Sequence, residues 1–424
     1  MQQANISVNN FEQCTKCTIC TAYCPVTAVN PIYPGPKQAG PDGERYRLKN
    51  AEFFDNALKY CLNCKRCEVA CPSDVRIGDI IQAARLKYTK GRPALRDTML
   101  ANTDFMGTMA TMVAPIVNWS LSLKPTKVVM DKVLGIAKER TFPKYASQKF
   151  MSWYKSRAAR VQETFDKKVT YFHGCYVNYN NPGQGKAFVA VANALGYGVM
   201  TMQGEKCCGV AKIANRLLDE ARRDADINTA AIRRALAANP GSEVVGTSST
   251  CILTLRDEYP HLLGIDNHDV HDSISLSTRW ISQLLESGSV RLVWRKDYRK
   301  RIAYHTPCHM ARLGWVPYTV GLLRMIPGVE LTELVQQCCG IAGTYGFKKE
   351  NYRYSQEIGS AIFTQIRDIN PELVATDCET CRWQIEMSTG YDVLNPIEIL
   401  ADALDLEATA RANGVADKFA MLGR

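Results

Sequence analysis

The sequence lacks the glycine-rich motifs that hold nucleotide phosphates. Gly183 and Gly185 do not continue into Gly-x-Gly-x-x-Gly, and no Gly-x-x-x-x-Gly-Lys-Ser/Thr occurs, so flavin, nicotinamide and nucleotide have no visible site. The first residues also lack the basic start and apolar run of an export signal. With seventeen cysteines among 424 residues, this absence favours a reducing compartment, where metal or redox chemistry outranks disulfides.

Acidic residues are scarce in one segment only. Residues 124–168 hold twelve Lys and Arg against four acidic residues, a net +8 within the formal +10 of the whole chain. The rest of the chain is close to neutral, so a nucleic-acid-binding protein has little support.

The strongest signal is a pair of cysteine runs with one spacing. They read Cys14-x2-Cys17-x2-Cys20-x3-Cys24-Pro25 and Cys61-x2-Cys64-x2-Cys67-x3-Cys71-Pro72. Bacterial-type ferredoxins hold cubane iron–sulfur clusters with this run, and its fourth Cys ligates the other cluster. We therefore expect two [4Fe–4S] clusters, the first held by Cys14, Cys17, Cys20 and Cys71 and the second by Cys61, Cys64, Cys67 and Cys24. Zinc and disulfides are the alternatives, but structural zinc usually takes two separated Cys pairs.

The cysteine runs belong to a first unit, residues 1–100, in a chain long enough for two to four domains. Between the runs, apolar residues recur at helical spacing, and these are Phe53, Phe54, Ala57, Leu58 and Cys61. The segment 75–88 also has the pattern of a helix. The long helical insertion predicts an α-helical ferredoxin domain rather than the compact β-containing type.

Residues 101–168 are predicted to form an amphipathic, basic linker. Residues 105–123 carry no charge, but they are too polar to span a membrane and Pro115 interrupts them. On a helix, a narrow polar stripe (Thr108, Thr111, Pro115, Asn118, Ser122) leaves a broad apolar face. The candidate membrane contacts on this face are Met106, Met109, Met112, Ile116 and Trp119.

A broad apolar face followed by a basic run suits a helix that lies in the membrane surface, because cations attract anionic headgroups. Further candidate anchors in the basic run are Phe142, Tyr145, Phe150, Met151, Trp153 and Tyr154. The alternative is a helical hairpin packed on the chain's own domains or on a partner subunit. The two interpretations are compatible.

Residues 169–424 contain an internal repeat. Strand-like segments ending in Cys175 and Cys308, two Cys-Cys-Gly motifs, and segments ending in Cys251 and Cys381 recur at offsets of 133, 131 and 130 residues. We therefore predict two α/β modules, residues 169–295 and 296–424. Each Cys follows a β-branched run, and the carboxyl ends of strands in an α/β unit converge on one crevice.

The second module brings together five cysteines and the first only four. These are Cys308, Cys338, Cys339, Cys378 and Cys381, against Cys175, Cys207, Cys208 and Cys251. Ser248 stands where the second module has Cys378. Five soft thiolates favour a further iron–sulfur cluster over zinc, for which four suffice. The first module could hold a cubane, a serine-ligated cluster, a labile disulfide or nothing, and buried structural thiols are the alternative in both modules.

Three of the six histidines lie near these cysteines. His173, His305 and His309 are candidate ligands or proton relays, or hydrogen-bonded residues at strand ends.

The two cysteine runs followed by paired Cys-Cys-Gly modules resemble the iron–sulfur subunits of flavoprotein dehydrogenases. These include the subunits of glycolate and lactate oxidases and of heterodisulfide reductase, and the CCG-type succinate dehydrogenase anchors. Among them the chain is most similar to the C-subunit family of anaerobic glycerol-3-phosphate dehydrogenases, over essentially its whole length. That family's CCG modules normally carry five cysteines each, so Ser248 is a departure.

The resemblance implies a non-catalytic electron-transfer subunit that also anchors its complex. Electrons would pass from a flavin-containing catalytic dimer through [4Fe–4S] clusters towards menaquinone. The location implied is peripheral, on the cytoplasmic side of the inner membrane. The alternatives are a glycolate- or lactate-type oxidase subunit, a cluster-fed thiol–disulfide reductase of the heterodisulfide type, and a passive membrane adaptor.

Overall fold

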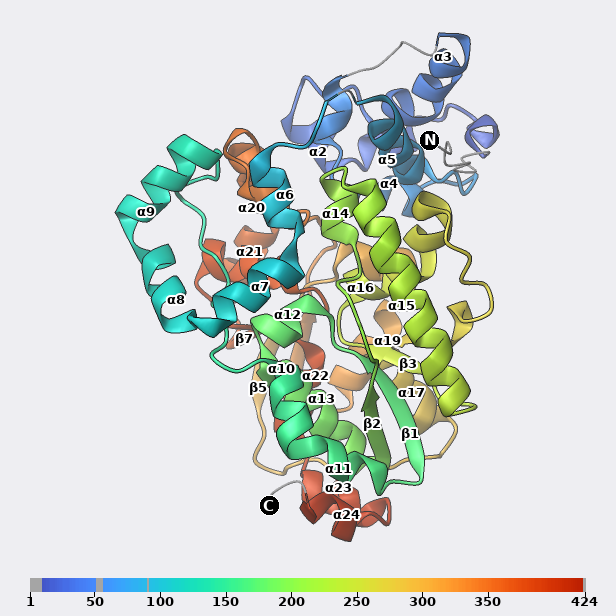
Figure 1. Ribbon diagram of the computed structural model, residues 1–424, viewed down its shortest axis with the longest axis vertical. Helices are drawn as coiled ribbons and strands as arrows, with labels where there is room; N and C mark the ends of the chain where they lie inside the picture. The colour runs from blue at the N-terminus through green and yellow to red at the C-terminus, as the bar shows by residue number, and fades with distance from the viewer. Residues whose placement is uncertain (1–9, 51–55, 90, 422–424) are drawn as a thin grey trace.

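The computed structural model describes residues 10–50, 56–89 and 91–421. Within those ranges the chain up to residue 101 forms short helices and no strand, which confirms the helical ferredoxin type (blue in Figure 1). Its elements are η1 (Phe11–Gln13), α1 (Ile19–Ala22), α2 (Pro25–Val29), η2 (Gln38–Asp42), α3 (Gly43–Lys49), η3 (Asn56–Tyr60), α4 (Arg66–Val69), α5 (Ile77–Tyr88) and α6 (Leu95–Ala101).

Of the two helices predicted in this region, one forms as expected and the other is much shorter. The helix expected over 75–88 is α5, and its Ile77, Ile80 and Ile81 are fully buried. The pattern before Cys61 yields only the short 3-10 helix η3. Phe53 and Phe54 lie outside the described residues.

The linker is a series of short helices. Pro115 lies in the first turn of the second of them, and the chain bends at Val113. The elements are α7 (Thr103–Met112), α8 (Ala114–Ser122), α9 (Lys124–Val129), η4 (Met130–Leu134), α10 (Phe150–Trp153), η5 (Tyr154–Ala158) and α11 (Ala159–Glu163). Of these, α8 and α9 project at the left of Figure 1, whereas α10 and α11 lie beside the first sheet. Among the residues described, no helix has both the length and the apolar character required to cross a membrane.

Two of the aromatic anchors expected in the basic run are part of the protein core. Phe150 and Tyr154 are buried and pack with Tyr171 and Phe188 of the first module. Their prediction as membrane contacts is wrong, because a helical register alone does not say which neighbour covers a side chain. Arg140, in the same basic run, is also fully buried.

The rest of the chain contains two four-stranded parallel sheets with the same topology. Their strand orders are β2-β1-β3-β4 and β6-β5-β7-β8. The register repeats too, since Thr170 pairs with Val244 in the first sheet and Ala303 pairs with Val374 in the second. These shared details confirm the α/β fold and the duplication seen in the cysteine spacing.

The elements of the first sheet region are β1 (Lys167–Phe172), α12 (Gly174–Tyr179), α13 (Pro182–Ala194), β2 (Tyr197–Thr201), α14 (Val210–Ala214), α15 (Leu218–Ala238), β3 (Val244–Gly246), α16 (Ser249–Leu253), η6 (Thr254–Leu263), η7 (His271–Ser273), β4 (Ile274–Leu276) and α17 (Ser277–Glu286). Those of the second are β5 (Lys300–Tyr304), α18 (Cys308–Leu313), α19 (Val316–Arg324), β6 (Val329–Glu333), η8 (Tyr345–Phe347), α20 (Lys349–Ile369), β7 (Leu373–Ala375), α21 (Glu379–Thr389), β8 (Val393–Leu394), α22 (Pro396–Ala403), α23 (Leu406–Ala412) and α24 (Ala416–Ala420).

The hydrophobic cores join the parts of the chain to one another. One core contains residues of both sheets and of α10, including Phe150, Phe188 and Ile397. Another joins the ferredoxin region to the second module, with Ile80, Cys338 and Tyr345 among its members. The ferredoxin region therefore packs on the edge of the second sheet region where the cysteines gather.

Candidate iron–sulfur sites

The backbone around the two cysteine runs has the same unusual shape twice. Lys16 and Thr18 in the first run, and Asn63 and Lys65 in the second, have positive φ angles between 54° and 65°. Backbone in which left-handed residues recur turns its N–H groups into one concavity, a nest that suits anions and occurs at many iron–sulfur sites. The loops therefore fit a negatively charged cluster by shape as well as by ligand type.

The thiols gather in two sets that each mix the two runs. Burial raises the pKa of Cys20, and the charges of its neighbouring thiols raise it further, these being Cys14, Cys71 and Cys17. Burial likewise raises the pKa of Cys67, with further contributions from Glu68 and from Cys64, Cys61 and Cys24. Each set thus holds three thiols of one run and one of the other.

The two sets differ in exposure. Cys17 of the first set is exposed, and Ile19 and Tyr23 beside it are exposed as well. Cys24 and Cys67 of the second set are buried. The first set therefore reaches the protein surface at Cys17, although its Cys20 is buried, whereas no thiol of the second set is exposed.

The second set touches the second module directly. The Cys64 thiol contacts Cys308, which lowers the pKa of Cys64, while the contact with Cys338 and burial raise it, to about 11 on balance. Sequence reasoning missed this contact, because nothing in the spacing of either motif says how separate domains dock. It makes a continuous path of sulfur atoms from the ferredoxin region into the second module.

Buried charges hold this junction together. Lys65 forms ion pairs with Asp79, with Glu68 at 3.5 Å, and with Glu258 of the first module at 3.9 Å. Arg312 of the second module donates to Glu68 at 3.1 Å. Because each of these charges is compensated inside the protein, the network fixes the loop of Cys64 and Cys67 against both modules.

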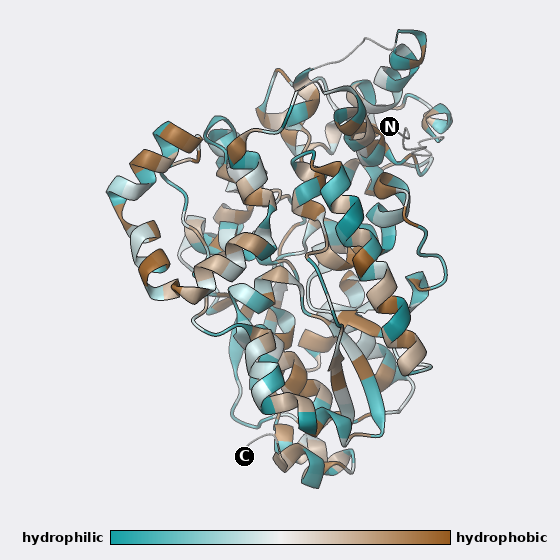
Figure 2. Cartoon of the chain, in the orientation of Figure 1, coloured by the Kyte–Doolittle hydropathy of each residue, from teal (hydrophilic) through white to brown (hydrophobic). Residues whose placement is uncertain are grey.

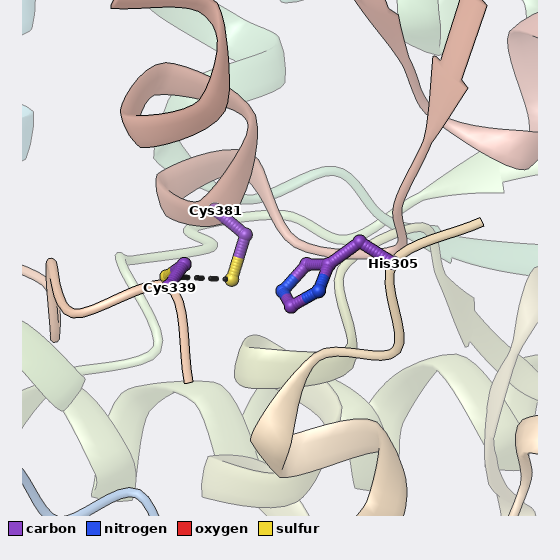
Figure 3. Close-up of side chains that lie close together, drawn as sticks. All are labelled: His305, Cys339 and Cys381. Carbon is purple, nitrogen blue, oxygen red and sulfur yellow. Dashed lines mark hydrogen bonds between the residues drawn. The ribbon is translucent and has the colours of Figure 1, made fainter. Parts of the chain in front are cut away.

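In the second module the remaining cysteines form a compact group (Figure 3). The Sγ atoms of Cys339 and Cys381 are 3.2 Å apart. Contacts with Cys338 and then with Cys381 hold the pKa of Cys339 well below its usual range. Contact with Cys381 lowers the pKa of Cys378 to about 5 despite its burial. Thiols with such neighbours ionise readily, as metal ligands must.

The first module holds its four thiols in a row. Cys207 contacts Cys175 and Cys208, which hold its pKa well below the usual range. Cys208 in turn contacts Cys251. The Cys207 N–H donates to Asp104 of α7 at 2.9 Å, and burial followed by the charge of Cys207 raises the pKa of Asp104 to about 6. Sequence reasoning did not identify Asp104, which lies far from the repeat in the chain.

Ser248, at the place of the missing fifth thiol, is engaged elsewhere. Its hydroxyl donates to Glu379 of the second module at 2.5 Å and accepts a weak hydrogen bond from the Cys251 N–H at 3.4 Å. Burial and then the charge of Cys378 raise the pKa of Glu379 to about 8. The serine is thus a contact between the modules.

The three histidines near the cysteines have different surroundings. His173 lies 3.1 Å from Glu205, and His309 lies 3.1 Å from the Asn63 carbonyl. His305 is 1% exposed, and neither of its ring nitrogens has a hydrogen-bond partner in the described part of the chain. Burial lowers the pKa of His305 to about 4.

Fold and thiol sets together define an iron–sulfur protein with a two-cluster ferredoxin region and two cysteine-rich α/β modules. Comparison with known proteins agrees. Residues 10–75 match the 4Fe-4S dicluster domain family, and residues 169–256 and 302–386 match the cysteine-rich CCG domain family.

The whole chain is similar to the C subunit of the anaerobic glycerol-3-phosphate dehydrogenase of Escherichia coli K12. The two are 55% identical over 395 residues, which cover 93% of this chain and 99% of the relative. The glycolate oxidase iron–sulfur subunit of the same organism is 25% identical, covering 93% and 94%. The D subunit of the dihydromethanophenazine:CoB–CoM heterodisulfide reductase of Methanosarcina barkeri is 23% identical, covering 96% and 95%. The chain belongs to the C-subunit family of anaerobic glycerol-3-phosphate dehydrogenases.

Proposed function

We propose that this chain is the electron-transfer and membrane-attachment subunit of an anaerobic glycerol-3-phosphate dehydrogenase complex. It takes electrons from a flavin-containing catalytic dimer and delivers them towards menaquinone at the membrane surface. The observation that carries the proposal is the contact of Cys64 with Cys308 and Cys338, because it connects the ferredoxin region to a second thiol site.

The exposure of the thiol sets supports one direction of electron transfer. The set with Cys71 would hold the first [4Fe–4S] cluster at the surface, where a partner can approach within electron-transfer distance of Cys17. The set with Cys24 would hold the second cluster, next to Cys308. Such clusters supply one-electron transfer over a wide range of potentials. Electrons therefore run from the exposed set to the buried set and on to the second module.

The second module is the better candidate for a third cluster. Its five thiols are Cys308, Cys338, Cys339, Cys378 and Cys381, and all are buried. In the first module Ser248 is bound to Glu379, which leaves Cys175, Cys207, Cys208 and Cys251 as the available donors. We propose a cluster in the second module and, at most, a four-thiolate centre in the first.

The linker supports attachment to a membrane surface. Met109, Met112, Ile116 and Trp119 are each more than half exposed, whereas Met106 is half-buried. Three residues of the polar stripe face the protein: Thr111 is buried, Thr108 contacts Tyr179 and Asn118 donates to the Tyr145 carbonyl, whereas Pro115 and Ser122 are exposed. The hydrophobic side of α7 and α8 therefore points away from the protein, and Figure 2 shows brown segments on this projecting arm. Burying this side in the lipid interface would recover the hydrophobic free energy of those side chains.

A thiol–disulfide reductase is less well supported. A disulfide substrate would need room beside the thiols of the two modules, but the loops there are bonded to each other. The Ser249 N–H donates to the Asp377 carbonyl at 2.8 Å, and Thr250 contacts Cys378 at 3.4 Å. These contacts join the loops that carry the two thiol groups.

The replacement Cys378→Ser tests the proposal, since it gives the second module the residue that the first module has at that place. In the reconstituted complex we expect less iron per chain and loss of glycerol-3-phosphate-driven menaquinone reduction, with membrane binding unchanged. The matched control is Cys251→Ser, which we expect to leave most of that activity. Normal menaquinone reduction by the Cys378→Ser complex would contradict the proposed route. Loss of a disulfide reductase activity instead would favour the alternative.

A further inference from the structure

His305 is the histidine of the thiol region whose surroundings are unexplained. It follows directly after β5, where its backbone N–H donates to the Ala375 carbonyl at 2.9 Å, so the position of the residue is fixed by the sheet. Its ring lies with the Sγ atoms of Cys339 and Cys381, and the three ligand atoms are within 4.8 Å of one another. Figure 3 shows the imidazole directed towards the Cys381 sulfur.

A buried imidazole without a partner is costly. A buried donor that is left unsatisfied destabilises the folded state, and neither ring nitrogen of His305 has a partner among the described residues. The hydroxyl of the preceding Tyr304 is already used, since it donates to Asp377 at 2.7 Å. The sulfur atoms of Cys339 and Cys381, within 4.8 Å of a ring nitrogen, are placed to satisfy this ring.

The fold does not require a histidine at this place. The cysteine alignment and the strand register both match His305 with Phe172 of the first module, where Phe172 is buried in an apolar core with Cys207 and Cys208. The second module, with five thiols, thus has an imidazole at this place, and the first module, with four thiols, has a phenyl ring. The histidine occurs in the module with the larger set of thiols.

Direct ligation and hydrogen bonding leave different atoms unsatisfied. A histidine that binds a metal usually donates its other ring N–H to a carboxylate, a carbonyl or water. No such acceptor is available to His305 in the described part of the chain, so ligation would leave a buried N–H without a partner. Donation of that N–H to a sulfur leaves only an acceptor nitrogen free.

We propose that His305 is a positioning residue that donates a ring N–H hydrogen bond to a sulfur atom of the centre in the second module, and so raises the centre's reduction potential. The added electron makes an iron–sulfur centre more negative, and a donor to its sulfur stabilises that state. The first module, with Phe172 in this place, would hold any centre at a lower potential. The inference rests on the proposed cluster of the second module.

The test compares His305→Phe, which installs the side chain of the first module, with His305→Gln, which keeps an N–H donor. EPR-monitored redox titration of the full-length protein measures the midpoint potential of the centre, and iron analysis counts its metal. We expect His305→Phe to lower the reduction equilibrium constant at least tenfold, about 59 mV for one electron. We expect His305→Gln to recover most of the lost midpoint potential. The control His173→Phe should leave the midpoint potential unchanged.

An unchanged potential in His305→Phe with iron retained would overturn the inference while leaving the proposed function intact. Absence of a third cluster in the unmodified protein would instead refute the proposed function on which the inference rests. If His305→Phe does not fold or loses iron, ENDOR spectra of the unmodified protein decide. A weakly coupled nitrogen with an exchangeable proton supports the hydrogen bond, and the strongly coupled nitrogen of a ligand contradicts it.

Discussion

Cys64 of the ferredoxin region contacts Cys308 of the second module, 244 positions further along the sequence. This contact turns two separate cysteine motifs into one route. Because a third thiol, Cys338, contacts both, the second cluster and the second module would lie next to each other. The buried pairs of Lys65 with Asp79 and Glu258 hold that arrangement.

The variants Cys71→Ser and Cys24→Ser test whether the last cysteine of each run binds the cluster of the other run. If each run borrows its last ligand from the other, Cys71→Ser damages the cluster of Cys14, Cys17 and Cys20, and Cys24→Ser damages the buried one. Iron analysis and EPR of the purified protein measure this. Loss of the buried cluster's signal in Cys71→Ser would show that each run instead keeps its own fourth cysteine.

Membrane attachment is tested by the double replacement Met112→Glu with Ile116→Glu, since both side chains are about two-thirds or more exposed. Burial of such a side chain is worth about 1.5–3 kcal/mol, so we expect binding to vesicles of phosphatidylglycerol and phosphatidylethanolamine to fall roughly a hundredfold or more. The matched control is Ile227→Glu with Val335→Glu, exposed apolar residues outside the linker. Equal losses in both variants would show that the linker is not the attachment site. Deleting the linker would be less informative, because Phe150 and Tyr154 belong to the core.

Arg140 should prove important for stability rather than for lipid binding. Its guanidinium donates to the Gly346 carbonyl and to Gln384 and Ser355, and it lies over the rings of Phe347 and Tyr352. Replacement by Ala leaves buried oxygens without a donor, so we expect a loss of about 2–4 kcal/mol in the free energy of unfolding. Denaturant unfolding measures it, and Lys138→Ala, an exposed basic residue nearby, should change it by less than about 0.5 kcal/mol.

Tyr154 should make the free energy of unfolding fall at alkaline pH. Burial raises the pKa of Tyr154 to about 12, and its hydroxyl donates to the Val199 carbonyl at 2.6 Å. The native state therefore keeps a proton that the unfolded chain loses above about pH 10. This stabilisation is complete below pH 10 and is lost as the pH rises through 12, at up to about 1.4 kcal/mol per pH unit.

The replacement Tyr154→Phe should remove that contribution to the pH dependence between pH 10 and 12. At neutral pH it should cost about 1–2 kcal/mol, because the Val199 carbonyl loses its donor. Unfolding curves measured across this range on the two proteins check both effects. An identical alkaline slope in both would refute the assignment to Tyr154.

Much of the architecture could be predicted from the sequence because it repeats. The cysteine spacing predicted the duplicated α/β modules, and the helical pattern of residues 75–88 predicted α5, whose observed bounds are Ile77–Tyr88. Contacts between modules could not be predicted, since no local pattern encodes docking. For that reason Asp104 at Cys207, Glu379 at Ser248 and the burial of Phe150 became visible only in the structure.

The central claim is that electrons from glycerol-3-phosphate pass through this chain to menaquinone. It is tested most directly by EPR of the anaerobic, reconstituted complex after adding glycerol-3-phosphate, and again after adding a menaquinone analogue. We predict that reduced-cluster signals of this chain appear with the first addition and disappear with the second. Contradiction would come if the signals never form while the catalytic dimer alone reduces the quinone at the same rate.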